Sequence, residues 1–187
     1  MPSYTLHYFT GRGLGEVSRQ LFELAGKPYT DKRHTQEEFP AEKSKFPFGQ
    51  LPVLEVDGKM IPQSFAVARY LANEFGFAGK TPYEKAWCDA LADQFKDYGA
   101  EVRPFLAVVM GFKEGDAKKL QKEVGEPARD KFYGQLEARL KESKSGFLVG
   151  DAVTWVDLAM ADHVDALQGL IPGFLDGFPK AGISYTY

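Results

Sequence analysis

Short apolar runs alternate with polar turns in the first part of the chain, and this pattern predicts a mixed α/β unit. Residues 3–9 are typical of a strand. A glycine-rich turn separates them from a helix expected at about 16–24, where apolar residues fall at helical spacing. Residues 29–34 indicate a second strand, and the polar stretch 35–46 is expected to form a loop or a short helix.

A β-hairpin and a further helix follow. Two apolar runs, Val53–Val56 and Met60–Ile61, flank Asp57-Gly58, and Asp-Gly is a strong hairpin signal because both turn residues must tolerate positive φ. Ser64 opens an apolar-periodic helix. The resulting order, β-α-β and then β-β-α, is the thioredoxin-like arrangement.

A linker at 76–82, which contains two glycines and a proline, separates this unit from a different pattern. Beyond the linker the chain reads as helical at about 83–111, 116–143 and 154–168. The sequence therefore predicts an α/β thioredoxin-like domain over residues 1–79, followed by an all-α helical domain over residues 80–187.

Three local signals refine the helical domain. Pro104 lies inside the first predicted helix and should kink it or end it, and Pro127 should divide the second in the same way. Thr154, followed three residues later by Asp157, fits a helix N-cap. We interpret this cap as structural, with a contribution of roughly 1 kcal/mol.

Composition narrows the class of protein. The formal net charge is −3 with no long basic block, which disfavours nucleic acid and anionic membranes as partners. No apolar run approaches the ~18 residues of a membrane span, and the first residues lead directly into a strand pattern without a signal peptide. The single cysteine, Cys88, excludes an internal disulfide, and the scattered histidines do not suggest a metal site. We therefore expect a soluble cytoplasmic protein.

The hairpin region also indicates a kind of ligand. Pro52, which opens the first hairpin strand, has no N–H to donate, so neighbouring backbone groups are left for something other than the sheet. Ser64 lies where a helix N-terminus presents N–H groups to an anion. An extended edge beside a helix N-terminus suits a short peptide that carries a carboxylate.

These features belong to a wider set of motifs that resembles a known family. The motifs are Tyr4-Thr5-Leu6-His7-Tyr8-Phe9, Gly11-Arg12-Gly13, Gly49-Gln50-Leu51-Pro52, Gln63-Ser64, Ala92-Asp93-Gln94 with Asp97-Tyr98, and Gly146-Phe147-Leu148-Val149-Gly150-Asp151. Their order and spacing are similar to those of the cytosolic glutathione transferases, above all to nematode-type members of the sigma class. The resemblance implies the cytosolic glutathione transferase fold, a homodimer, and glutathione as co-substrate without a metal.

The resemblance places the family's catalytic tyrosine at Tyr8. A tyrosine O–H that donates to sulfur stabilises the glutathione thiolate, which is the nucleophile, and so lowers the pKa of the thiol. A drop of about two pKa units corresponds to nearly 3 kcal/mol. The nucleophilicity of the thiolate falls as the pKa of its thiol falls, with a Brønsted β of about 0.4 to 0.5. Ionisation of the thiol alone then raises the reaction rate only a few-fold. Most catalysis must therefore come from holding the thiolate against an apolar electrophile.

The resemblance also implies the residues that bind each substrate. Ser64 and Gln63 would bind the γ-glutamyl end, and the Leu51 backbone, turned by a cis bond to Pro52, would pair with the cysteinyl unit. The glutathione-binding set is Tyr8, Phe39, Lys43, Gly49, Gln50, Leu51, Pro52, Gln63, Ser64 and Asp97. Asp97 would reach across a two-fold interface to the glutathione of the other subunit. The second-substrate pocket would be lined by Phe9, Gly13, Leu14, Tyr98 and Phe105.

The chain departs from the family at two places. Phe39 stands where relatives usually carry tryptophan, so the ring is kept but the indole N–H that would bond the glycyl carboxylate is lost. Such a bond is worth roughly 1.5 to 3 kcal/mol, and we expect weaker glutathione binding. Residues 180–187 lack the helical period with which relatives continue, which indicates truncated C-terminal helices.

We interpret the chain as a detoxifying transferase that conjugates the glutathione thiolate to small hydrophobic electrophiles. Two alternatives stay open at the level of sequence. One is a glutathione-dependent isomerase of the prostaglandin type, in which the same thiolate attacks a peroxide and leaves again. The other is a non-enzymatic protein, either a carrier of haem and other hydrophobic ligands or a crystallin-like structural protein.

Overall fold

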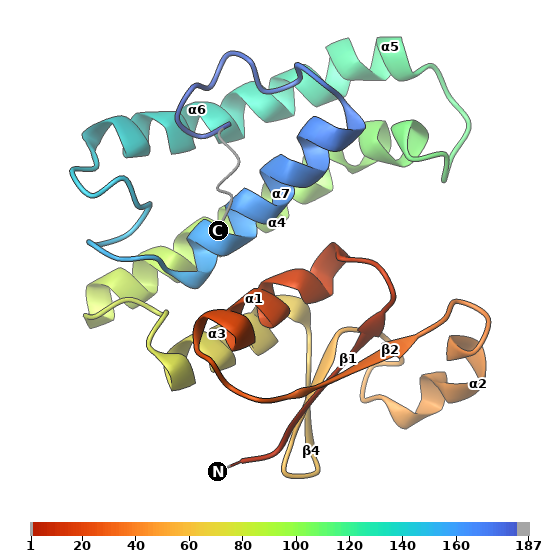
Figure 1. The fold of residues 1–187 in the computed structure, drawn as a ribbon. Helices are drawn as coiled ribbons and strands as arrows, with labels where there is room; N and C mark the ends of the chain where they lie inside the picture. Colours follow the sequence, from red (N-terminus) through yellow and green to blue (C-terminus); the bar gives the residue numbers. More distant parts are fainter. Residues whose placement is uncertain (1, 183–187) are drawn as a thin grey trace. The chain divides into compact units, whose positions relative to one another are not determined.

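The computed structural model describes residues 2–182 and divides the chain into two compact units, Met1–Ala78 and Gly79–Tyr187. Figure 1 shows a sheet with helices in the first unit and helices alone in the second. The division falls one residue before the boundary predicted from the linker. No helix in the described part is long and apolar enough to cross a membrane.

The first unit is built on a four-stranded mixed sheet. Its strands are β1 (Tyr4–Phe9), β2 (Thr30–His34), β3 (Val53–Val56) and β4 (Lys59–Pro62), in the spatial order β2-β1-β3-β4. β1 pairs in parallel with β2 and antiparallel with β3, which in turn pairs antiparallel with β4. The central position of β1 brings its last residues next to both β2 and the hairpin.

Two helices provide the apolar core of this unit. α1 (Glu16–Leu24) and α3 (Ser64–Phe75) pack against each other, and they bury Leu21, Phe22 and Leu71 completely. Consecutive strand residues point to opposite faces, so neighbouring β1 side chains enter different environments.

A single turn, α2 (Phe39–Glu42), and the short η2 (Lys43–Lys45) follow β2. The buried ring of Phe46 lies 5.3 Å from the His7 ring and 5.6 Å from the His34 ring, so this segment packs on polar strand residues as well as apolar ones. The hairpin turn has φ of 48° at Asp57 and 78° at Gly58, as its Asp-Gly sequence predicts.

The second unit contains α4 (Pro82–Val109), α5 (Ala117–Leu120), a π-helical turn η3 (Gln121–Gly125), α6 (Glu126–Glu142) and α7 (Trp155–Leu170). Pro127 lies in the first turn of α6, directly after η3, and the backbone stays helical from α5 through η3 into α6. The predicted division at Pro127 is therefore a change of helix type and not a break. α4 runs through Pro104 to Val109. Of the two expected effects of Pro104, the end of the helix does not occur, and the kink stays a prediction. Phe105 and Val102, both 1% exposed, anchor the helix on either side of the proline.

The core of the helical unit is aromatic. Tyr98 stacks on Phe132 at 4.6 Å between ring centroids, and His163 packs edge-on against Tyr98 at 5.5 Å. α7 begins at the predicted cap, where the Thr154 N–H donates to Asp157 Oδ2 at 2.8 Å and both parts of a capping box are present. The Leu148 N–H donates to the other oxygen of the same carboxylate at 2.8 Å.

Candidate active site

A cavity of about 450 Å³ opens in the first unit beside the start of β3 and the start of α3. Its lining residues are Phe9, Leu14, Phe39, Lys43, Gly49, Gln50, Leu51, Pro52, Pro62, Gln63 and Ser64. All of these except Pro62 were predicted from the sequence as site residues. Pro62 ends β4 directly before Gln63. Its position at the end of the hairpin is the feature of the sequence that could have identified it as a lining residue.

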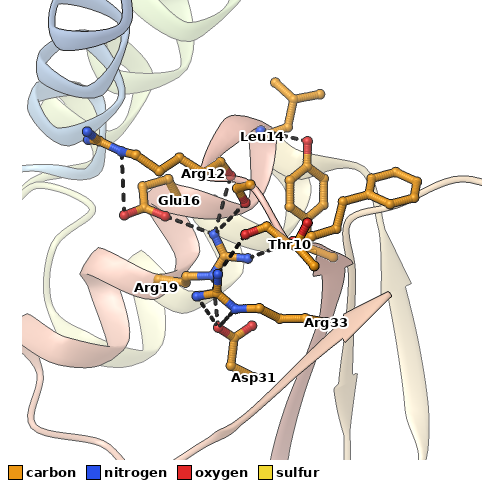
Figure 2. Close-up of polar contacts among 10 residues, drawn as sticks. Thr10, Arg12, Leu14, Glu16, Arg19, Asp31 and Arg33 are labelled. Carbon is orange, nitrogen blue, oxygen red and sulfur yellow. Dashed lines mark hydrogen bonds and ion pairs between the residues drawn. The ribbon is translucent and has the colours of Figure 1, made fainter. Parts of the chain in front are cut away.

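Tyr8, near the end of β1, is not among the residues that line this groove, but its hydroxyl contacts one of them. The backbone N–H of Leu14, a lining residue, donates to Tyr8 Oη at 2.9 Å (Figure 2). A phenol donates one hydrogen bond and can also accept. The contact with Leu14 uses Oη as acceptor, and the phenolic proton remains to be donated to a further group.

The turn after β1 allows the Tyr8 ring to lie where it does. A Cβ atom built on Gly13 would be 2.7 Å from Tyr8 Oη, and one built on Gly15 would be 2.6 Å from Tyr8 Cδ1. Gly13 also has a φ of +41°, which L side chains rarely adopt. The glycines noted in the sequence therefore have a specific role, which is to bring the turn against the phenol.

A buried arginine, Arg19, donates hydrogen bonds to backbone carbonyl groups of the same turn. Its guanidinium donates to the carbonyls of Phe9 at 3.3 Å, Gly11 at 3.1 Å and Arg12 at 3.3 Å. Its Cζ atom also lies 5.7 Å from the centre of the Tyr8 ring. Arg19 thus connects α1 to the backbone that directly precedes the part of the loop in contact with Tyr8.

Two carboxylates neutralise this guanidinium, as Figure 2 shows. Arg19 pairs with Glu16 at 2.8 Å and with Asp31 of β2 at 3.1 Å. Burial lowers the pKa of Arg19, but the bonds to the two carboxylates outweigh it and the pKa is raised above its ordinary value. Arg12 pairs with Glu16 at 3.7 Å, so it closes a salt bridge. The role of Arg19 was not predicted from the sequence. Its position among the buried residues of an amphipathic helix is the feature that could have indicated a buried arginine.

The start of α3 is strained where an anion could bind. Gln63, directly before the helix, has φ 77° and ψ 120°, and a non-glycine residue in such a region costs of order 1–3 kcal/mol. Strain of this kind persists where the surrounding structure imposes it, often at ligand sites. Ser64 then begins the helix, whose first N–H groups have no intrahelical partner.

The backbone before β3 has the expected conformation, because the Leu51–Pro52 bond is cis. On the other side of the groove, the Lys43 side chain crosses close to Gly49: a Cβ atom there would be 3.1 Å from Lys43 Cε. The Phe39 ring packs edge-on against Phe9 at 5.1 Å. The lining of the groove thus includes a cationic group and a helix N-terminus.

Three predicted residues belong to the helical unit. Asp97 is exposed on α4, which leaves its proposed reach across an interface a prediction. Tyr98 and Phe105 are each 1% exposed, and their rings pack within the helical core. Their contribution to a pocket shared with Phe9, Gly13 and Leu14 also stays a prediction.

The remaining reactive candidates are inert in this structure. Cys88 is fully buried, and burial raises the pKa of its thiol to about 11, so the cysteine is a core residue. Among the residues that the structure describes, no three or more His, Cys, Asp and Glu side chains are placed to hold a metal ion.

Both units of the chain match known protein families. The family described as "Glutathione S-transferase, N-terminal domain" matches residues 4–73, and "Glutathione S-transferase, C-terminal domain" matches residues 102–183. The probable glutathione S-transferase 5 of Caenorhabditis elegans is 58% identical over 165 residues, which are 87% of this chain and 80% of that protein.

Two solved structures show the same likeness in three dimensions. Monomeric Na-GST-3 from the hookworm Necator americanus is 54% identical with a TM-score of 0.92, over 96% of this chain and 87% of that one. A Nu-class transferase from Haemonchus contortus is 52% identical with a TM-score of 0.89, over 97% of this chain and 88% of that one.

The chain belongs to the glutathione S-transferase family. It is a glutathione transferase, with the thioredoxin-like and all-helical domains of that fold. The narrower assignment to the sigma class is not confirmed, because the Haemonchus contortus relative is described as Nu-class.

Proposed function

We propose that Tyr8 donates a hydrogen bond to the sulfur of glutathione bound in the 450 Å³ groove. This bond stabilises the thiolate that forms when the thiol releases its proton to solvent, and the thiolate then attacks small hydrophobic electrophiles. The observation that carries this assignment is the hydrogen bond from the Leu14 N–H to Tyr8 Oη. It fixes the hydroxyl beside Leu14, a residue that lines the groove, and it uses Oη as the acceptor, so that the phenolic proton is left to be donated.

The chemistry of the lining residues supports a placement for the rest of the tripeptide. The γ-glutamyl carboxylate is placed at Ser64, where the N-terminus of α3 favours an anion, with Gln63 beside it. The cysteinyl backbone pairs with Leu51 as an added strand. Lys43 offsets the glycyl carboxylate, and Gln50 contacts the same end. Each role extends the family resemblance to a residue that lines the cavity.

The finer assignments are proposals of the same kind. We infer a nematode-type enzyme that works in detoxification in the cytoplasm as a homodimer, with Asp97 contributing to the partner's glutathione site. The Necator americanus relative is described as monomeric, so sedimentation of this chain at micromolar concentration is the direct test of the dimer. The class label, sigma or Nu, changes none of the proposed chemistry.

Retention on immobilised glutathione, measured together with turnover of an aryl halide, tests the proposed function. The unaltered chain should be retained and should turn over the halide, and Tyr8→Phe should still be retained. In this variant kcat/KM at pH 6.5 should fall about fivefold or more, and the pH of half-maximal rate should rise by about two units, because the thiol loses its donor.

Two results would count against this function. Retention without turnover by the unaltered chain would favour a carrier of hydrophobic ligands. Turnover by Tyr8→Phe with an unshifted pH profile would show that another group stabilises the sulfur. Tyr83→Phe is the matched control, because Tyr83 is 72% exposed on α4, and it should leave both measurements unchanged.

A further inference from the structure

Two guanidinium groups hold the turn that follows β1 by its backbone carbonyls. Arg19 on α1 donates to the carbonyls of residues 9, 11 and 12, and Arg33 on β2 donates to the carbonyl of Thr10 at 2.8 Å. Four successive carbonyl groups of the turn therefore accept hydrogen bonds from charged donors, as Figure 2 shows. Bonds from charged donors are stronger than those between neutral groups, so the two arginines fix the course of the turn.

A single carboxylate oxygen joins the two arginines. Asp31 Oδ2 on β2 accepts from Arg19 Nε at 3.1 Å and from Arg33 Nε at 2.8 Å (Figure 2). The side chains of Arg19 and Asp31 are 7% and 21% exposed, whereas that of Arg33 is 46% exposed. Solvent therefore screens Arg33 more than it screens the pair of Arg19 and Asp31. The orientation of both guanidiniums thus depends on Asp31.

The register of the sheet brings this cluster to Tyr8. β1 and β2 pair in parallel, with Leu6 opposite Asp31 and Tyr8 opposite Arg33. Alternate residues of a strand lie on the same face, so Asp31 and Arg33 share one face of β2. Arg19 Cζ lies 5.7 Å from the centre of the Tyr8 ring. The cluster therefore lies on the side of the sheet where the Tyr8 ring lies.

The turn is rich in glycine and depends on such contacts for its order. Gly11 and Gly13 lie within it, and glycine loses more backbone freedom on folding than any other residue. A Cβ atom on Gly11 would meet nothing within 4 Å, so packing does not confine the backbone at this point. The bonds from the two arginines to the carbonyls therefore supply order that the residues of the turn do not provide by themselves.

The ordered turn leads directly to the donor that fixes the phenol. The last carbonyl that Arg19 holds is that of Arg12, and two residues later the Leu14 N–H donates to Tyr8 Oη at 2.9 Å. A displacement of the carbonyls moves this N–H as well, because the peptide groups between them are planar and few. The phenol would then be free to turn its proton away from a bound sulfur.

We propose that Asp31 is a positioning residue for Tyr8. By binding both arginines it fixes the turn over residues 9–12, and the fixed turn keeps the Leu14 N–H on the phenolic oxygen. Asp31 is not among the residues that line the groove, so it acts on the sulfur through Tyr8. Without its carboxylate the turn moves, the phenol donates to the sulfur for a smaller share of the time, and the thiolate is less stable. The inference rests on the proposed function, because it takes Tyr8 to stabilise the glutathione thiolate.

The pKa of the glutathione thiol, bound to the full chain and followed by the ultraviolet absorbance of the thiolate, tests this inference. In Asp31→Ala this pKa should rise by about one unit, which is a tenfold change in the ratio of thiolate to thiol. A drop of about two units from ~8.5 gives the unaltered complex a thiol pKa of about 6.5. The kcat with an aryl halide should therefore fall about fivefold at pH 6.5 and less than about twofold at pH 8.5. The Kd of S-methylglutathione should stay within about threefold, because Asp31 does not line the groove.

A second variant separates positioning from a simple effect of charge. Asp31→Ala removes a negative charge, which by itself would favour the thiolate and lower the thiol pKa. Arg33→Met removes a positive charge, which by itself would raise it. Positioning predicts a rise in both variants, because each releases the turn. Arg33 is 46% exposed, so Arg33→Met should fold even if Asp31→Ala does not. Its rise should persist at high salt, which screens charges at exposed positions.

Arg139→Met is the matched control. Arg139 on α6 also donates to a backbone carbonyl, that of Leu148, and its Cζ atom lies 4.0 Å from the centre of the Trp87 ring. Like Asp31→Ala, this variant should lower the free energy of unfolding in urea. Unlike Asp31→Ala, it should leave the thiol pKa and kcat unchanged.

The outcomes separate this inference from the function on which it rests. If the unaltered chain binds glutathione without lowering the pKa of its thiol, the proposed function is wrong and the inference falls with it. If the unaltered chain lowers the thiol pKa, and Asp31→Ala leaves it unchanged or lowers it further, only the inference is overturned. An unshifted thiol pKa in Arg33→Met, or an equal rise in Arg139→Met, would overturn it as well.

Discussion

Gly15→Ala tests whether the close approach of the turn to Tyr8 is needed for catalysis. Gly15 has φ −88° and ψ −18°, an ordinary helical conformation, so alanine adds no backbone strain. Its Cβ would lie 2.6 Å from Tyr8 Cδ1, 2.7 Å from Cγ and 3.0 Å from Cβ. Carbon atoms pack at about 3.5 to 4.0 Å, so the ring must retreat by about 1 Å.

This displacement involves the Cβ and Cγ atoms of Tyr8 and not only the far end of the ring. The hydrogen bond from Leu14 to Tyr8 Oη, now 2.9 Å long, should stretch beyond the usual range. A misplacement of about 1 Å in a catalytic group can cost roughly a hundredfold in rate. We therefore expect kcat to fall by about tenfold to a hundredfold, with the KM for glutathione nearly unchanged.

Gly134→Ala is the matched control. Gly134 lies within α6, and a Cβ there would meet nothing within 4 Å. Alanine should therefore raise the free energy of unfolding by about 1 kcal/mol through helix propensity alone, without any change in kcat. Steady-state kinetics with an aryl halide, together with urea unfolding, measures both effects. The reasoning is refuted if Gly15→Ala turns over as fast as Gly134→Ala.

Three further predictions concern the rest of the chain. Arg19→Met should lower the free energy of unfolding by about 3 kcal/mol, because Glu16 and Asp31 lose their buried partner; urea unfolding at pH 7 measures it, and an unchanged midpoint would contradict it. His163→Phe should make the free energy of unfolding less sensitive to acid. Burial lowers the pKa of His163 to about 4, so as the pH falls the unfolded chain binds this proton before the native protein does. The free energy of unfolding should therefore fall by about 3 kcal/mol between pH 6.5 and pH 4. The variant should lack this loss in urea titrations at the two pH values. Phe39→Trp should lower the KM for glutathione, because the indole restores a donor for the glycyl carboxylate; an unchanged KM would show that residue 39 makes no such bond.

The sequence by itself determined the elements and most of the groove. The Asp57-Gly58 turn, the helix that starts at Ser64 and the cap at Thr154 depend on residues close together in the chain, so their signals are complete within a few positions. The family motifs then identified nearly every residue that lines the cavity.

Only the tertiary structure decided which buried polar groups meet. His7 and His34 are 27 positions apart, and each looked like an isolated histidine until the pairing of β1 with β2 brought them within 3.2 Å. Arg19 likewise finds its partners through folding, on the loop after β1 and on β2. A buried polar atom must find a partner, but the identity of that partner depends on strand order and register, which no short stretch of the sequence contains.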